Sequence, residues 1–118
     1  EVVITHPEGY ELNPEKTNGA TIEYDQKKAF EGADFIYTKN WSSYKDYGKV
    51  ACTDSAWTIS ADKMEVTDNA KFMHCLPVRR NVVVADEVLD SDTSIVIEQA
   101  NNRTFSAQIV LKKIIENM

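Results

Sequence analysis

The pattern that most restricts how this chain can fold is a short helical segment between two apolar runs. The apolar runs cover residues 20–24 and 33–38, and the helical segment covers 26–31. Asp25 can cap the helix because its carboxylate accepts from the first free N–H groups, and Gly32 can end it in the left-handed conformation. A strand–helix–strand order predicts two parallel strands joined by a right-handed crossover.

Other apolar runs extend this pattern along the chain. They predict three further strands, at 2–5, 71–77 and 93–97, and two further helices, at 84–90 and 103–117. The last helix carries apolar residues spaced three and four apart, as on one helical face. We therefore expect an α/β fold with an open, mainly parallel sheet flanked by helices.

Length and composition fit one globular domain. The sequence has 118 residues, 42% of them hydrophobic, and it lacks the long apolar run of a membrane helix. A net charge of −6 argues against a nucleic-acid partner. Cys52 and Cys75 make no disulfide framework and suit a reducing cytoplasm, and the His and Cys spacing predicts no metal site. Because the first strand begins at once, we expect a segment of a longer protein.

The stretch 41–69 has no clean periodicity. We expect helical turns at 42–47 and 60–64 within it. A segment of this length in a compact domain is usually a functional loop, so we expect a lid that excludes water from a ligand.

A dense group of reactive side chains follows the strand predicted at 71–77. His74 and Cys75 lie near its end, Pro77 stops the hydrogen-bond ladder, and Arg79 and Arg80 come directly after. Taken singly, each has an ordinary interpretation: a core cysteine, a hydrogen-bonded histidine, surface arginines. Together they indicate an anion site, because guanidinium groups fit carboxylates and phosphates and ligands bind at the carboxyl edge of open α/β sheets.

The run from Met73 to Asn81, Met-His-Cys-Leu-Pro-Val-Arg-Arg-Asn, resembles the signature of the ornithine-type carbamoyltransferases. It is most similar to the subgroup that acts on N-acylated ornithine, and the resemblance extends over nearly the whole chain. It implies that residues 1–118 form most of the C-terminal, amino-acid-binding domain of a two-domain enzyme. It also implies that the N-terminal carbamoyl-phosphate domain belongs to the part of the enzyme outside this chain. The family also implies a homotrimer with active sites between subunits, and the free thiols predict a cytoplasmic location.

The same resemblance assigns roles to individual residues. It implies that His74, Cys75 and Arg103 are catalytic, with His74 near the reacting carbonyl oxygen. It implies that Cys75, the backbone carbonyl of Leu76 and Arg103 bind carbamoyl phosphate. It implies no metal and no cofactor.

Lys39 marks a departure from the ornithine enzymes. They carry an aspartate there, followed by a Ser-Met-Gly loop that binds the free α-ammonium of ornithine, whereas this chain has Ser-Ser-Tyr at 42–44. Acylation removes the charge of the α-nitrogen, so an aspartate would lack a partner, and the substrate carboxylate needs a cation instead. We expect Lys39 and Arg79 to bind an acylornithine. An ordinary surface lysine is the alternative.

The implied reaction transfers the carbamoyl group of carbamoyl phosphate to the δ-amine of an N-acyl-L-ornithine, in arginine biosynthesis. The acetyl branch has a His-Val-Gln-Lys run in its last helix where residues 105–108 are Phe-Ser-Ala-Gln, which favours N-succinylornithine over N-acetylornithine. The isolated segment should be inactive, because the main phosphate loop of the family belongs to the other domain. The alternatives are an ordinary ornithine carbamoyltransferase, a non-catalytic α/β ligand-binding domain, and a structural or regulatory fragment.

Overall fold

The structure is a computed structural model, and it describes residues 1–43, 45–48 and 52–118. The described strands are β1 (Val3–Ile4), β2 (Thr21–Ile22), β3 (Phe35–Thr38) and β4 (Lys71–His74). The described α-helices are α1 (Gln26–Phe30), α2 (Ala61–Met64), α3 (Asp86–Leu89) and α4 (Val96–Glu116). Short 3-10 helices cover η1 (Pro14–Lys16) and η2 (Ser55–Trp57). Tyr44, within the predicted helical turn 42–47, lies outside the described residues.

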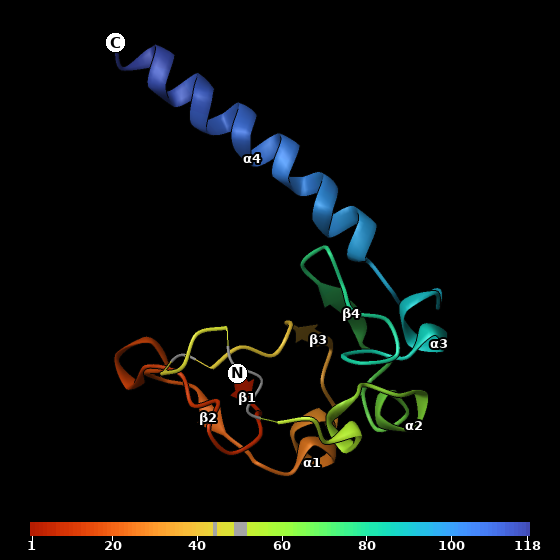
Figure 1. Cartoon of the computed structure of the whole chain (residues 1–118). Helices are drawn as coiled ribbons and strands as arrows, with labels where there is room; N and C mark the ends of the chain where they lie inside the picture. The colour runs from red at the N-terminus through yellow and green to blue at the C-terminus, as the bar shows by residue number, and fades with distance from the viewer. Residues whose placement is uncertain (44, 49–51) are drawn as a thin grey trace.

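The strands pair in parallel, but β2 and β3, which flank α1 and were predicted to pair through a crossover, lie in different sheets. β1 pairs with β2, and β3 pairs with β4, in two separate two-stranded sheets of the described chain. The β3–β4 register joins Phe35 to Lys71 and Thr38 to His74. The α/β class is therefore confirmed, and the carboxyl ends of β3 and β4 lie together (Figure 1).

The predicted cap of α1 is confirmed. Asp25 Oδ1 accepts from the backbone N–H of Lys27 at 3.0 Å and of Lys28 at 3.3 Å. Gly32, just beyond the helix, has a φ of 67°, which glycine adopts without strain. This local chemistry ends the helix early enough for the chain to enter β3.

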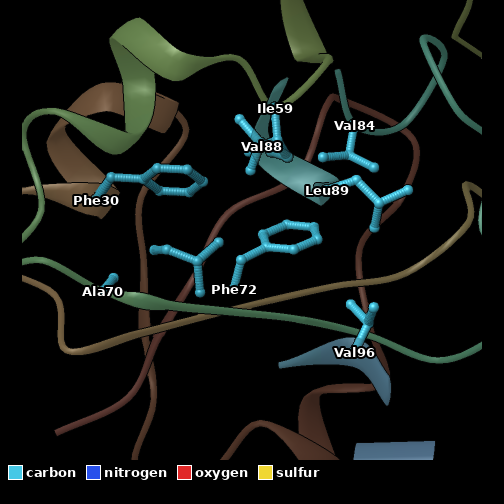
Figure 2. Close-up of a cluster of buried hydrophobic side chains, with 9 residues drawn as sticks. Phe30, Ile59, Ala70, Phe72, Val84, Val88, Leu89 and Val96 are labelled. Atoms are coloured by element: carbon cyan, nitrogen blue, oxygen red, sulfur yellow. The ribbon is translucent and has the colours of Figure 1, made fainter. Parts of the chain in front are cut away.

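The hydrophobic core lies between the β3–β4 pair and the short helices α1, α2 and α3 (Figure 2). Ile36 and Phe72 are directly paired across the two strands, and in a parallel pair such partners point to the same face of the sheet. Phe72 is fully buried there with Val84. The other buried members are Phe30, Ile59, Ala70, Val88, Leu89 and Val96.

The predicted loop 41–69, of which residues 44 and 49–51 lie outside the described residues, contains η2 and α2 in its second half. Ile59 is buried and pairs with Val84 by a parallel bridge. Its N–H donates to the carbonyl of Val83 at 2.9 Å, and the N–H of Ala85 donates to its carbonyl at 2.8 Å. Ile59 and Ala70 therefore belong to the core, with Met64 and Val66 packed against it, because burial of these apolar side chains is favourable.

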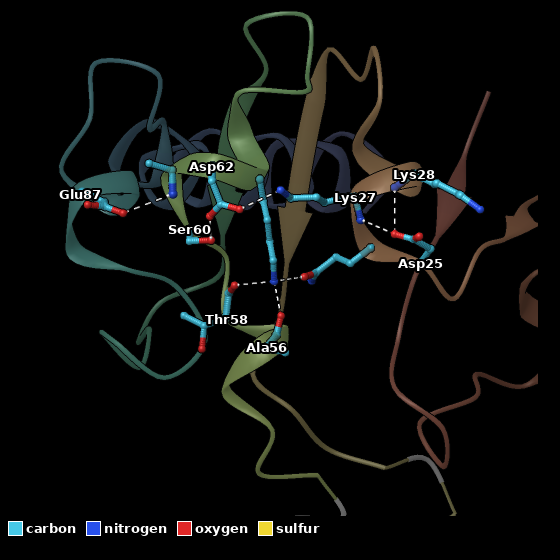
Figure 3. A network of polar contacts seen from close by, with 11 residues as sticks. Asp25, Lys27, Lys28, Ala56, Thr58, Ser60, Asp62 and Glu87 are labelled. Atoms are coloured by element: carbon cyan, nitrogen blue, oxygen red, sulfur yellow. Dashed lines mark hydrogen bonds and ion pairs between the residues drawn. The ribbon is translucent and has the colours of Figure 1, made fainter.

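Lys63, a partly buried lysine on α2, connects this part of the chain to α1. Lys63 Nζ donates to Gln26 Oε1 at 2.5 Å, to the carbonyl of Thr58 at 2.9 Å and to the carbonyl of Ala56 (Figure 3). Burial lowers the pKa of Lys63. The ammonium group of Lys63 thus donates to backbone carbonyls in and just after η2 that have no partner within that helix. The helical turn predicted at 60–64 is confirmed as α2.

The last predicted strand is wrong. Within 93–97, only Ser94 forms a parallel bridge, with Phe72, and the backbone enters α4 at Val96 instead of at Arg103. The N–H of Phe72 donates to Thr93 and the N–H of Ile95 donates to Phe72, so a single ladder step forms. Val96 then reaches the core from the first helical turn, which buries the apolar run without a longer strand.

Helix α4 projects from the rest of the chain (Figure 1). Every residue from 100 to 118 is exposed. The apolar residues of its stripe are Ala107, Val110, Leu111, Ile114, Ile115 and Met118. The helical periodicity was correctly predicted, but the stripe is exposed and no other described element covers it (Figure 1). No helix among the described residues is long and apolar enough to cross a membrane.

Two phenylalanines on paired strands test this account of the core. Phe72→Ala should lower the free energy of unfolding by about 3–5 kcal/mol, because Phe72 is 0% exposed and packs on all sides. Phe35→Ala is the matched control: Phe35 is 63% exposed, so its loss should change stability by about 0.5 kcal/mol at most. Denaturant unfolding of both variants measures the difference, and equal losses would contradict the described core.

Candidate functional site

The carboxyl ends of β3 and β4 form one edge, and a side chain joins the two segments that leave it. Asn40, two residues beyond β3, donates from Nδ2 to the carbonyl of Pro77 at 3.2 Å. The peptide bond before Pro77 is cis. Because Thr38 and His74 are in register, Lys39 and Cys75 each follow directly at this edge. The sequence marked Lys39 but gave no reason to assign a role to Asn40.

His74 is fully buried, and its environment determines its tautomer. Nδ1 contacts the carbonyl oxygen of Cys75. A carbonyl oxygen only accepts, so the proton lies on Nδ1 and Nε2 of the neutral ring is an acceptor. Burial lowers the pKa of His74. Nε2 has no hydrogen-bond partner among the described residues. A ring in this position orients the Cys75 carbonyl.

The residues after His74 become progressively more accessible. Cys75 is half-buried and carries a free thiol, and Leu76 is exposed. Both belong to the chain segment that Asn40 ties to β3 through Pro77. The backbone around them can therefore present carbonyl groups at the strand edge. No group of three or more His, Cys, Asp or Glu side chains that could hold a metal lies in the described part of the chain.

The two adjacent arginines have different environments. Arg80 donates from Nη1 to Asp86 Oδ1 at 2.7 Å and binds both carboxylate oxygens of Asp90 at 2.7 Å. These contacts raise the pKa of Arg80 and lower the pKa of both carboxyl groups, chiefly through the hydrogen bonds. Arg79 is exposed, and its side chain has no hydrogen bond or ion pair with any described residue. Only Arg79 thus keeps its donors for an anion.

The turn that carries both arginines is fixed on several sides. Asn81 has a φ of 57°, in the left-handed region that asparagine tolerates. Its Nδ2 donates to Asp86 Oδ2 at 2.7 Å, and its Oδ1 accepts from the N–H of Asp86 at 3.0 Å. Asn81 thus attaches the turn to the first residue of α3, although Ala85 is the N-cap of that helix. Its Asp86 partner, and Asp90 behind it, were missed by sequence reasoning, because acidic residues on a short helix carry no signal of their own.

The remaining predicted residues are placed as follows. Lys39 is exposed at the strand edge, and its side chain has no partner among the described residues. Arg103 does not lie at the start of the last helix, where the sequence pattern placed it. It lies two turns into α4, exposed on that helix and without a hydrogen bond or ion pair to the described chain. The structure thus brings Lys39 to the edge that carries His74, Cys75 and the segment leading to Arg79, and it does not bring Arg103 into contact with them.

Residues 1–114 match the family described as "Aspartate/ornithine carbamoyltransferase, Asp/Orn binding domain". N-succinylornithine carbamoyltransferase of Bacteroides fragilis is 58% identical over 120 residues, covering 100% of this chain and 38% of the relative. The enzyme of the same name from Bacteroides thetaiotaomicron is also 58% identical, over 98% of this chain and 37% of the relative. The chain thus spans well under half the length of these curated relatives.

Solved structures of transcarbamylases are similar to this chain in fold. Acetylornithine transcarbamylase complexed with acetylcitrulline is similar with a TM-score of 0.72 at 30% identity, over 87% of this chain and 36% of that one. A mutant of N-acetyl-L-ornithine transcarbamylase complexed with carbamyl phosphate and N-succinyl-L-norvaline has a TM-score of 0.72 at 30% identity, with the same coverage. The likeness therefore extends over most of the described fold.

The tautomer and burial of His74 predict a pH dependence of stability. Because the folded chain holds His74 with a lowered pKa, the unfolded chain binds the proton more readily. The free energy of unfolding should therefore fall as the pH is lowered from about 7 through the ordinary histidine range near 6.5. In His74→Gln this part of the slope should disappear, whereas His6→Gln, the other histidine, should keep it. Denaturant unfolding at a series of pH values measures the slopes, and equal slopes in wild type and His74→Gln would contradict the buried neutral ring.

Proposed function

The chain belongs to the aspartate/ornithine carbamoyltransferase family, in its Asp/Orn-binding domain, and we propose that it forms most of the amino-acid-binding domain of an N-acylornithine carbamoyltransferase. Its substrates are carbamoyl phosphate and an N-acyl-L-ornithine, with N-succinylornithine favoured over N-acetylornithine. The 58% identity to two N-succinylornithine carbamoyltransferases supports the succinyl group. In this proposal the carbamoyl-phosphate domain is a separate, N-terminal part of a longer chain.

The observation that carries the proposal is the charge at the edge of β3 and β4. Lys39 and Arg79 are exposed cations without partners among the described residues, in a chain whose net charge is −6. A free ornithine would bring an α-ammonium to this edge and be repelled. An acylornithine lacks this α-ammonium charge, and its α-carboxylate is a group that an ammonium and a guanidinium bind well.

The proposed reaction is a single acyl transfer. The neutral δ-amine attacks the carbonyl carbon of carbamoyl phosphate and forms a C–N bond. The C–O bond to phosphate then breaks, phosphate leaves with the bonding electron pair, and the nitrogen loses a proton. The products are N-acylcitrulline and phosphate. The protein contributes mainly position and charge stabilisation.

The residues at and after the end of β4, together with Arg103, have different proposed roles in this reaction. The carbonyl of Leu76 accepts from the carbamoyl NH₂ group, and Cys75 lines the same position. His74 was predicted to be catalytic through contact with the carbonyl oxygen. Its full burial and its contact with the Cys75 carbonyl favour a positioning role instead. Arg103 supplies positive charge for carbamoyl phosphate, presented by α4 toward the rest of the longer enzyme.

The assembly and location complete the proposal. A homotrimer with active sites between subunits fits a domain whose exposed arginine, Arg103, lies away from the strand edge. A cytoplasmic location fits the free thiols of Cys52 and Cys75. The chain alone should be inactive, since the proposed phosphate loop lies outside it.

The substrate class is tested on the full-length enzyme that contains this segment. Carbamoylation is measured in parallel with ornithine, N-acetylornithine and N-succinylornithine. We expect turnover with N-succinylornithine and none with ornithine. Turnover of free ornithine would return the protein to the ordinary ornithine enzymes, and binding without turnover of any of the three would favour a ligand-binding domain.

Lys39 should be a substrate-binding residue in the same enzyme. Lys39→Ala should raise the KM for N-succinylornithine about 10-fold to 100-fold, because a charge-assisted hydrogen bond contributes about 1.5–3 kcal/mol. The KM for carbamoyl phosphate should stay unchanged. Lys28→Ala, which removes an exposed lysine from α1, is the matched control and should change neither constant. An unchanged KM for the acylornithine in Lys39→Ala would return Lys39 to an ordinary surface residue.

A further inference from the structure

The segment between β4 and α3 is held at two points, and Arg79 lies between them. At one end, Asn40 donates to the carbonyl of Pro77 at 3.2 Å and ties the segment to β3. At the other end, Arg80 and Asn81 bind α3 and the residue that follows it, through Asp86 and Asp90. A side chain between two anchors has its backbone direction fixed before any ligand arrives.

The contact of Arg80 with Asp86 and Asp90 restricts the orientation of the turn although these side chains are partly exposed. Arg80 is about half exposed, and isolated surface ion pairs contribute little to stability. Here, however, one guanidinium binds two carboxylates, and it binds Asp90 through both of its oxygens. Fork geometry of this kind restricts orientation as well as adding energy. The contact thus specifies the direction of the chain more than it stabilises the fold.

Backbone contacts carry this restriction to the residues on either side. The N–H of Val83 donates to the carbonyl of Arg79 at 3.0 Å, and the N–H of Asn81 donates to the carbonyl of Val84 at 2.7 Å. Thr58 Oγ1 donates to the carbonyl of Val82 at 2.7 Å. The turn is therefore closed on itself and attached to the buried Ile59–Val84 crossing, with Arg80 as its only charged anchor to α3 among the described residues.

We propose that Arg80 is a positioning residue for substrate binding. Its pairing with Asp86 and Asp90 directs Arg80 toward α3 and leaves the adjacent Arg79 directed to the acylornithine carboxylate. Arg80 thus binds carboxylates of the protein itself, and Arg79 binds the carboxylate of the ligand. This inference rests on the proposed function, because it concerns how the same substrate is held.

The test uses the full-length enzyme and two disruptions of the same contact. Arg80→Gln and Asp90→Asn should each raise the KM for N-succinylornithine about 10-fold, since a small misplacement of a binding group is costly, while kcat and the KM for carbamoyl phosphate stay within about twofold. Because Arg80→Gln already removes the contact with Asp90, the double variant should be no worse than Arg80→Gln alone. Arg80→Lys keeps the charge and should recover part of the loss.

Lys27→Gln is the matched control, because Lys27 forms an ion pair of similar exposure with Asp62, at 3.0 Å, on α1 and α2 (Figure 3). It should leave every kinetic constant unchanged. The positioning role is overturned if Arg80→Gln leaves the KM for the acylornithine unchanged, if it raises both KM values equally, or if Lys27→Gln has the same effect. A wild-type enzyme that turns over no acylornithine would overturn the proposed function itself, and wild-type turnover with an unaffected Arg80→Gln would overturn only the role of Arg80.

Discussion

The parallel pairing of β3 with β4 is the constraint on which the rest of the structure depends. It buries Ile36 and Phe72 side by side on one face, and the short helices pack on that face. Because the pair is parallel, both strands end at the same edge, so residues 36 positions apart in the sequence, such as Thr38 and His74, arrive together. The Asn40–Pro77 hydrogen bond forms at this edge, and the proposed ligand-binding cations follow it. One hydrophobic contact thus provides both the stability of the core and the location of the candidate site.

Burial and exposure divide the motif that follows β4 into parts with different tasks. His74 is inside, neutral, and bound to the carbonyl of its own neighbour. Arg80 lies at the surface but is engaged by two carboxylates. Arg79, between these fixed groups, keeps its donors. Charge alone does not distinguish the two arginines, since both are always protonated. The position of α3 distinguishes them, because it places Asp86 and Asp90 within reach of only one.

Helix α4 carries apolar residues that the rest of the described chain does not bury. Its apolar stripe has the spacing of a packed helix face, yet every residue from 100 onward is exposed. Arg103 lies on this helix and not at the strand edge. A hydrophobic stripe is stabilised only when another surface covers it, and in the described chain none does. The contribution of Arg103 to any reaction therefore depends on groups beyond those that form the core.

The sequence by itself determined the elements whose signals are local. Asp25 and Gly32 bounded α1, the apolar runs located β3 and β4, and the run around His74 and Cys75 identified the family. The tertiary structure decided what depends on distant partners. Ile59 is part of the core because it pairs with Val84, which is distant in the sequence. Val96 is buried in the first turn of α4, although its apolar run predicted a strand. Arg80 differs from Arg79 because the carboxylates of Asp86 and Asp90 bind only Arg80. Local chemistry fixes backbone conformation within a few residues, whereas burial and ion pairing are decided by which segments the fold brings together.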